Sequence, residues 1–230
     1  GGSSPAGPDA EAPGPDAAPL PDAAATPGPD GSCPAPGEGF SFSPGPATGG
    51  VQDGWGERTV DPQTLESLLA SWTLQVDGLV LTPTTFSFAE LLCLPRQDQV
   101  TDFHCVEGWS ISDVPWNGIR LSWLLDRVGV APGATHVVFH TVGDTYNESH
   151  PLDVAREERT LLGYGIAGNT LPLKHGFPLR VVIPRLCGYK NAKYIYKISL
   201  ADAPLEGFWV QAGYPYGGEV SPDRLRPGKY

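Results

Sequence analysis

The sequence predicts an α+β fold, in which short strands form mixed β-sheet and a few short helices pack beside it. Two observations favour this class. Many short β-prone runs occur between residues 72 and 200, some alternating apolar with polar residues and some continuously apolar. Few stretches between them carry apolar residues at helical spacing. Many short strands with few short helices, and no internal repeat, are typical of an α+β domain.

Composition divides the chain into two parts. Residues 1–50 contain 12 Pro and 11 Gly, six acidic residues, and no Lys or Arg. Because this segment has few apolar side chains to bury, it cannot offset the entropy cost of ordering its backbone. Residues 1–50 are therefore expected to form a disordered tether. Residues 51–230 carry 20 acidic against 15 basic residues and have enough apolar content for one folded domain.

The amino terminus suggests where the protein works. The Gly-Gly-Ser-Ser start and the long Pro/Ala/Asp-rich tether resemble the region that follows the lipidated cysteine of bacterial lipoproteins. We therefore expect a periplasmic or cell-surface protein, attached to the membrane through a lipid anchor preceding Gly1. No apolar run approaches the roughly 18 residues that would span a bilayer.

Charge and cysteine spacing exclude several classes. The net charge of −11 and the lack of a basic stripe argue against nucleic acid as a partner. The cysteines Cys33, Cys93, Cys105 and Cys187 form no CxxC motif, which leaves zinc ribbons, thioredoxin-like redox pairs and c-type haem unsupported. In an exported protein two cysteines could pair, with Cys93 and Cys187 as one option, but the sequence does not fix the connectivity.

The first half of the domain has a readable order of elements. A capped helix is expected from Asp61, a strand over 72–78, its hairpin partner over 79–81 after Asp-Gly, a strand over 84–88 and a short helix over 89–92. A strand over 100–106 contains Cys105. Residues 114–118 have turn chemistry, and residues 121–128 form a helix closed by Gly129.

The second half is richer in strands. Residues 135–142 form a β-run, followed by a looser polar stretch over 143–150 and a short helix within 151–158. Residues 161–166 are apolar, and residues 169–173 are expected to form a turn and a short strand. Further strands are expected in 181–183 and 194–200, and the chain closes with a Gly/Pro/Tyr-rich tail.

Cys105 lies in a strand-like run and is followed at once by a glycine turn and Trp109. A lone cysteine in a strand is usually a small buried hydrophobe. In a period-2 strand Cys105 shares a face with Phe103, whereas His104 points the other way, so the two do not form a Cys-His nucleophile pair.

Two basic clusters downstream suit a polyanion. They are His175-Gly176-x-Pro178-x-Arg180 and Gly188-Tyr189-Lys190-Asn191-Ala192-Lys193. Each combines glycine, which lets the backbone approach a ligand closely, with cationic donors that can bind a phosphate. The alternative for each cluster is a solvated loop.

Taken together, these motifs resemble the sulfite-oxidase-type molybdopterin oxidoreductases, in particular the periplasmic methionine-sulfoxide reductase catalytic subunits. The motifs run in family order, as FHCVEGWS (103–110), VPWxGxxL (114–121), FHT (139–141), DTY (144–146), HGxPLR (175–180), GYKxxK (188–193) and GFW (207–209). The match covers roughly residues 72 to 214. It implies a sulfite-oxidase-like molybdopterin-binding fold.

The resemblance also implies a molybdenum-molybdopterin cofactor and roles for individual residues. Cys105 would bind the molybdenum through its thiolate, a soft ligand that suits this metal. Tyr146 would hydrogen-bond to a substrate oxygen or to an oxygen ligand of the metal. The cofactor itself would be held by Thr141, His175, Arg180, Lys190, Asn191, Ala192 and Lys193.

The implied activity is extracytoplasmic oxygen-atom transfer on a small or protein-borne substrate such as a sulfoxide. His104 stands where the family commonly has an arginine, and the arginines nearest to Cys105 in sequence are Arg96 and Arg120, so sulfite is not favoured. Electrons would pass to or from a separate partner, a haem protein or a quinone-linked membrane subunit. Two alternatives stay open: a sulfite-type oxidase, and a cofactor-free binding module tethered at the cell surface.

Overall fold

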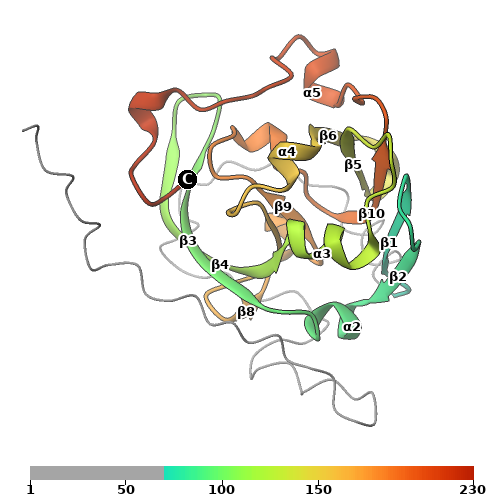
Figure 1. The fold of residues 1–230 in the computed structure, drawn as a ribbon. Helices are drawn as coiled ribbons and strands as arrows, with labels where there is room; N and C mark the ends of the chain where they lie inside the picture. Colours follow the sequence, from blue (N-terminus) through green and yellow to red (C-terminus); the bar gives the residue numbers. More distant parts are fainter. Residues whose placement is uncertain (1–69) are drawn as a thin grey trace, which may run out of the picture.

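The structure, a computed structural model, describes residues 70–230. The expected tether over 1–50 and the helix expected from Asp61 lie outside the described residues. Within 70–230 the chain forms two five-stranded mixed or antiparallel sheets with short helices between and beside them (Figure 1). The predicted α+β class with mixed sheet is confirmed.

The first sheet pairs the first strand of the described chain with the last one. Its strand order is β2-β1-β10-β5-β6, and β1 and β10 run parallel while the other pairs are antiparallel. The parallel pair sets Gln75 opposite Lys197. The strands are β1 (Thr73–Gly78), β2 (Thr84–Ser87), β5 (His136–Thr141), β6 (Glu148–Pro151) and β10 (Ile195–Ala201).

The second sheet is antiparallel and built on a long curved hairpin, which is the green ribbon in Figure 1. Its order is β3-β4-β7-β8, and β9 also pairs with β7. The strands are β3 (Gln97–His104), β4 (Ser110–Arg120), β7 (Leu161–Ile166), β8 (Asn169–Thr170) and β9 (Arg180–Val182).

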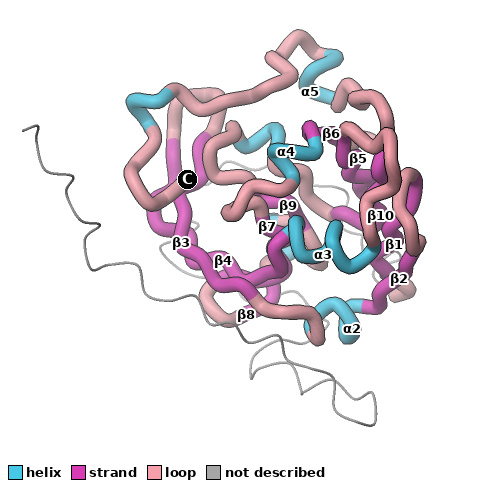
Figure 2. Tube along the Cα trace, in the orientation of Figure 1, coloured by secondary structure: helices cyan, strands magenta, loops and turns pink. Residues whose placement is uncertain are grey.

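The helices are short, as Figure 2 shows. The α-helices are α2 (Phe88–Leu92), α3 (Leu121–Val128), α4 (Leu152–Ala155) and α5 (Phe208–Gln211). Single 3-10 turns are η1 (Val142–Asp144), η2 (Leu173–His175), η3 (Gly188–Lys190) and η4 (Pro222–Arg224). No helix in the described part of the chain is both long and apolar enough to cross a bilayer.

Two predicted helices are confirmed, and their sequences explain their ends. Helix α2 begins at a capping box, in which the Ser87 hydroxyl accepts from the Glu90 amide and the Glu90 carboxylate accepts from the Ser87 amide. Helix α3 buries Leu121, Leu124, Leu125 and Val128 along one face and ends at Gly129, whose φ of 69° favours glycine.

The predicted hairpin between residues 72–78 and 79–81 is wrong. Strand β1 exists, but its antiparallel partner is β2, and Leu81 instead donates its amide to the Gly129 carbonyl. A side chain on Gly78 would clash with the backbone of Leu200 in the parallel neighbour β10. Asp-Gly therefore marks a close approach of two strands and not a hairpin turn.

The turn predicted over residues 114–118 is also wrong, because these residues lie inside β4. Strand β4 is paired on both sides, by β3 and by β7, and this pairing overrides the local turn preference of Pro and Gly. A Cβ on Gly118 would clash with the Leu162 carbonyl, and the register of β4 against β7 shifts at this residue. Gly118 thus permits a bulge.

The stretch over 143–150, expected to be loose because it is polar, contains the strand β6. Glu148, Ser149 and His150 are all buried, and β6 pairs with β5 through the Phe139–Glu148 register.

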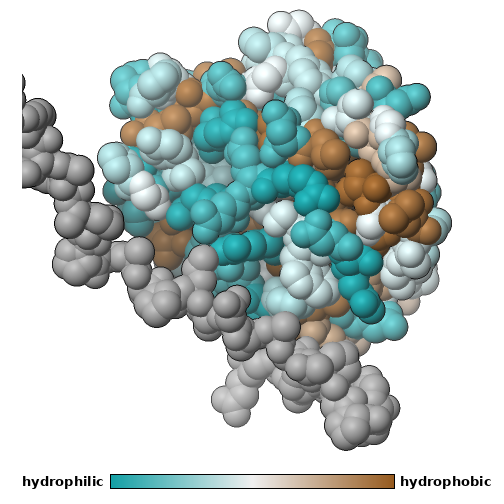
Figure 3. All heavy atoms as spheres, viewed as in Figure 1, coloured by the Kyte–Doolittle hydropathy of each residue, from teal (hydrophilic) through white to brown (hydrophobic). Residues whose placement is uncertain are grey.

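The face of the molecule seen in Figure 3 is mostly hydrophilic, with apolar side chains gathered mainly toward its right side.

Candidate functional site

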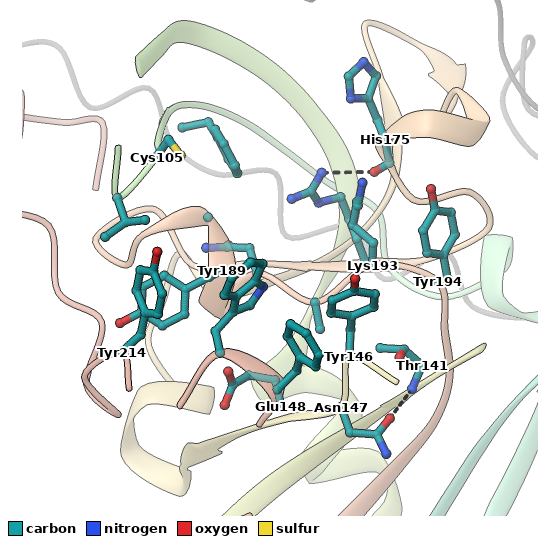
Figure 4. Close-up of a pocket in the computed structure, with 18 of the residues that line it drawn as sticks. Cys105, Thr141, Tyr146, Asn147, Glu148, His175, Tyr189, Lys193, Tyr194 and Tyr214 are labelled. Carbon is teal, nitrogen blue, oxygen red and sulfur yellow. Dashed lines mark hydrogen bonds between the residues drawn. The ribbon is translucent and has the colours of Figure 1, made fainter. Parts of the chain in front are cut away.

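A cavity of about 470 Å³ lies where the two sheets meet the carboxyl-terminal segment. This volume is in the range of sites for cofactors and small ligands. Cys105 lies on one side of it, and His175, Lys193 and Tyr194 lie on another (Figure 4). The lining residues are Phe103, Cys105, Val106, Glu107, Trp109, Thr141, Tyr146, Asn147, Glu148, His175, Arg180, Gly188, Tyr189, Asn191, Ala192, Lys193, Tyr194, Phe208, Trp209 and Tyr214.

Cys105 is presented by the turn of the β3–β4 hairpin. The predicted strand over 100–106 ends earlier than expected, at His104, and Cys105 is the first residue of the turn. The Cys105 amide donates to the Trp109 carbonyl at 2.9 Å, and the Gly108 amide donates back to the Cys105 carbonyl at 3.2 Å. Gly108 has a φ of 99°, which favours glycine. The thiol therefore projects from a closed, hydrogen-bonded turn.

The two residues before Cys105 face opposite directions, as the strand period predicts. Phe103 lines the cavity with Cys105, whereas His104 is buried outside the lining, with its Nδ1 2.8 Å from the Ser110 hydroxyl. Burial lowers the pKa of His104. The prediction that His104 does not pair with the thiol is confirmed.

The Cys105 thiol has an acidic neighbour. The Glu107 Oε2 atom lies 3.8 Å from the Cys105 Sγ atom and accepts a hydrogen bond from the Trp109 indole at 3.1 Å. Burial raises the pKa of the Cys105 thiol, and the negative charge of Glu107 acts in the same direction. Without a cation the sulfur is therefore a thiol at neutral pH.

Asp102, three residues before Cys105, is a buried carboxylate held by Arg226. Arg226 binds both oxygens of Asp102, and the Asp102 Oδ1 atom also accepts the Asp113 amide at 2.9 Å. The hydrogen bond from Arg226 is the largest cause that lowers the pKa of Asp102. A carboxylate whose pKa is lower in the folded state stabilises that state above its unfolded pKa of about 3.9 and loses this effect as the pH falls.

The Arg226→Ala variant is therefore expected to be less stable than the wild type at pH 7, with a difference that shrinks below about pH 4. Urea unfolding at pH 7 and at pH 3 measures this difference. Arg127→Ala, which removes an exposed arginine in the last turn of α3, is the matched control. A difference of equal size at both pH values would contradict the assigned role of Asp102.

The other side of the cavity is cationic. Arg180 is buried, donates from Nη1 to the His175 carbonyl at 3.0 Å, and stacks over the rings of Phe103 and Trp116 at 5.6 and 5.0 Å. Lys193 donates to the Lys174 carbonyl at 2.9 Å. Burial, followed by the charge of Arg180, lowers the pKa of His175 to about 3, and burial lowers the pKa of Arg180 to about 10. A bound anion would relieve this positive field.

Gly176 explains why glycine follows His175 in this cluster. Its φ is 107°, and a Cβ there would lie 3.0 Å from the Lys193 Cβ atom. Glycine thus lets the two basic clusters, which are separate in sequence, pack against each other. The structure brings both clusters to the same cavity.

The predicted residues of the second cluster do not all face the cavity in the same way. Asn191 and Ala192 are in the lining, but the Asn191 side chain is bonded to the Ile183 amide and to the Leu186 and Cys187 carbonyls. Lys190 is outside the lining. Its ammonium donates to Glu148 at 2.6 Å and to the Ser149 carbonyl at 3.3 Å, and lies 4.3 Å from the Tyr216 ring centroid.

Thr141 and Tyr146 form a third wall. The Thr141 hydroxyl is buried and has no hydrogen-bond partner within residues 70–230, whereas its amide donates to Asn147 at 2.8 Å. The Tyr146 ring packs on Phe208 at 4.7 Å. Further ring contacts link Phe208, Trp209, Tyr214 and Tyr189 in turn, at 5.1, 5.4 and 5.3 Å.

Sequence reasoning missed several lining residues. Glu148 lay in a stretch interpreted as loop, although its position beside a β-run was a usable signal. Tyr189 stands inside the second basic cluster, whereas Tyr214 lies in the tail, where the density of tyrosine was only a weak signal. Asn147 is adjacent to the predicted Tyr146, and no pattern in the sequence marked it.

The suggested pairing of Cys93 with Cys187 is wrong. Cys93 is disulfide-bonded, but Cys187 is a free buried thiol, as Cys105 is a free and partly exposed one. Cys187 is the N-cap residue of η3, and its sulfur lies 3.9 Å from the Glu219 carbonyl oxygen.

Comparison with known proteins identifies the domain. The family described as the oxidoreductase molybdopterin binding domain matches residues 61–209. The chain is 37% identical over 151 residues to the uncharacterized oxidoreductase YuiH of Bacillus subtilis, across 66% of this chain and 76% of that protein.

Two further relatives carry more specific names. A putative protein-methionine-sulfoxide reductase subunit, YedZ1, of Azospira oryzae is 36% identical over 158 residues. The protein-methionine-sulfoxide reductase catalytic subunit MsrP of Gluconobacter oxydans is 35% identical over 176 residues. These alignments cover 69% and 68% of this chain but only 60% and 56% of those two relatives.

A solved structure has the same fold. The sulfane dehydrogenase SoxCD from Paracoccus pantotrophus superposes with a TM-score of 0.57 at 22% identity, over 66% of this chain and 43% of that one. The fold is therefore the sulfite-oxidase-like one that the motifs implied. This chain belongs to the family of oxidoreductases with a molybdopterin-binding domain.

Proposed function

We propose that the protein is an extracytoplasmic, molybdenum-dependent oxidoreductase that transfers an oxygen atom, with a neutral sulfoxide as substrate. The observation that carries the choice of substrate is Glu107, whose carboxylate lies 3.8 Å from the Cys105 sulfur. A fixed negative charge beside the reaction centre disfavours the sulfite anion, whereas it does not repel a neutral sulfoxide.

The cavity fits a molybdopterin group by its donor chemistry. Cys105 supplies a soft sulfur ligand for the metal. The Thr141 hydroxyl is a buried polar group that lacks a partner within the described residues. Arg180 and Lys193 supply positive charge that suits a phosphate, and the neutral His175 ring beside them could take part in hydrogen bonding. When bound, the cofactor would supply two-electron redox chemistry and a site for the transferred oxygen.

The remaining task of the protein is to bind and orient the substrate. Sulfur makes favourable contacts with aromatic rings, and Tyr146, Phe208, Trp209 and Tyr214 form a connected aromatic wall. Tyr146 is one of the lining residues, and its hydroxyl would donate to the sulfoxide oxygen. Reduction consumes two electrons and two protons and yields a thioether and water, so a separate electron-transfer partner is required.

The proposed reduction of a sulfoxide to a thioether is tested with the chain of residues 1–230, made in a molybdopterin-competent host. Molybdenum per chain is measured first, and then sulfoxide reduction with a reduced viologen dye is compared with sulfite oxidation by ferricyanide. We expect stoichiometric molybdenum and sulfoxide reduction. A metal-free protein would favour the tethered binding module, and sulfite oxidation without sulfoxide reduction would favour the sulfite-type oxidase.

The extracytoplasmic location rests on two supports. One is the Pro/Gly/Asp-rich amino-terminal region, and the other is the disulfide at Cys93, since disulfides persist mainly in oxidising compartments. We propose attachment by a lipid anchor preceding Gly1. Mass spectrometry of the native amino terminus tests this, and an unlipidated, uncleaved start would refute it.

Thr141→Val is expected to weaken cofactor binding without lowering the stability of the cofactor-free chain. The change removes a hydroxyl without a partner in residues 70–230, so the cofactor-free chain should be at least as stable as wild type. Cofactor affinity should fall by roughly tenfold through the loss of one hydrogen bond. Molybdenum content and urea unfolding of the cofactor-free chain check both effects, and unchanged molybdenum retention would contradict the contact.

A further inference from the structure

The carboxyl-terminal residues that follow the family match, which ends at residue 209, reach back to the turn carrying Cys105. Arg224, the last residue of η4, donates from Nη1 to the Cys105 carbonyl at 3.1 Å. Its Nη2 atom donates to the Trp109 carbonyl at 2.9 Å and to the Ser110 hydroxyl at 3.0 Å. A single guanidinium group therefore holds both ends of the turn.

The segment that carries Arg224 is anchored on both sides of it. Before it, the Val220 amide donates to the Arg185 carbonyl at 2.9 Å. After it, Arg226 binds the buried Asp102 of β3, and Lys229 pairs with Asp113 of β4 at 2.6 Å. The carboxyl-terminal chain thus runs beside the β3–β4 hairpin, as Figure 1 shows, and Arg224 is held over the turn.

The contacts suit arginine in particular. A guanidinium group offers five donors in a rigid planar fork, so it can serve three acceptors at once. The Ser110 hydroxyl that accepts from Arg224 also lies 2.8 Å from the His104 Nδ1 atom, so the residue before Cys105 is tied to the same group. An ammonium at this place could reach only some of these acceptors.

We infer that Arg224 is a positioning residue that fixes the direction of the Cys105 sulfur by clamping the backbone of its turn. The inference rests on the proposed function in one respect, the assignment of Cys105 as the metal ligand. Arg224 is absent from the cavity lining and acts only through the turn. Groups that orient a metal ligand typically change metal affinity by about 10–100-fold when removed.

The test compares Arg224→Ala, Arg224→Lys and the control Lys229→Ala in the full chain. Lys229 belongs to the same segment, but its side chain forms an ion pair with the half-exposed Asp113. The first readout is the alkylation rate of Cys105 by iodoacetamide in chain made without cofactor. The second is the electron paramagnetic resonance spectrum of Mo(V) together with molybdenum content.

We expect iodoacetamide to alkylate Cys105 about tenfold faster in Arg224→Ala than in the wild type, because the turn loses three charge-assisted hydrogen bonds. In Lys229→Ala the alkylation rate should equal that of the wild type. The Mo(V) spectrum of Arg224→Ala should shift and its molybdenum content should fall, with partial recovery in Arg224→Lys. Should Arg224→Ala not fold, Arg224→Lys carries the comparison.

The inference would be overturned if the Arg224 variants showed the wild-type rate of Cys105 alkylation and an unchanged Mo(V) spectrum. Equal changes in Arg224→Ala and Lys229→Ala would also overturn it, since the segment would then act only as an anchor. If the wild-type chain binds no molybdenum, the proposed function fails by that result alone. The alkylation rates of the cofactor-free chain still decide whether Arg224 holds the Cys105 turn.

Discussion

Cys105→Ser is expected to abolish molybdenum retention and oxidoreductase activity while leaving the fold intact. The hydroxyl of serine is a hard, weakly acidic ligand that replaces a soft thiolate, and the residue sits in a turn closed by backbone hydrogen bonds that serine preserves. Since outer-shell partners of metal ligands already cost about 10–100-fold, loss of the ligand itself should reduce metal affinity by more than about 100-fold.

The structure supplies a matched control in Cys187. It is the second free thiol among the described residues, is buried, and is absent from the lining of the main cavity. Molybdenum analysis and circular dichroism of Cys187→Ser should both resemble wild type. If Cys105→Ser kept wild-type molybdenum, or if both variants lost it equally, Cys105 would not be the ligand.

The parts of the site that the sequence predicted are those defined by short motifs. Cys105, His175 and Arg180 each sit in a local pattern whose chemistry is readable without the fold, and all three line the same cavity. Their neighbours Glu148 and Tyr214 come from a strand edge and from the tail, and only the tertiary structure places them there. No local pattern specifies such long-range contacts.

The errors in the secondary-structure prediction also arise from long-range contacts. Local turn chemistry at Asp77-Gly78 and at Pro115–Gly118 was interpreted as a change of direction, yet each glycine lies where a neighbouring strand approaches closely. Pairing of β1 with β10 joins residues about 120 positions apart, and β4 is enclosed by β3 and β7. Conversely, α2 and α3 were predictable because caps and helical periodicity are local signals.

Lys190 shows how a correct motif can carry a structural role. It lies in the basic cluster predicted to bind cofactor, but its ammonium is 1% exposed and bonded to the Glu148 carboxylate, which is 3% exposed. The Glu148 Oε1 atom also accepts the Ser149 amide at 2.8 Å. Burial raises the pKa of Glu148, against the opposing charge of Lys190. The pair thus joins η3 to β6, with Glu148 in the lining of the cavity and Lys190 outside it.

Lys190→Met is expected to destabilise the folded chain by about 3–5 kcal/mol, because it leaves the buried Glu148 carboxylate without its partner. The double variant Lys190→Met with Glu148→Gln should recover much of this loss, since no unpaired charge then remains. Urea unfolding of the cofactor-free chain measures both, with Lys229→Ala as a control that breaks the ion pair between the partly exposed Lys229 and Asp113. A cofactor ligand would affect stability only when the cofactor is present, whereas a structural ion pair acts in its absence as well. Wild-type stability of cofactor-free Lys190→Met would therefore return Lys190 to the cofactor-binding role that its motif implied.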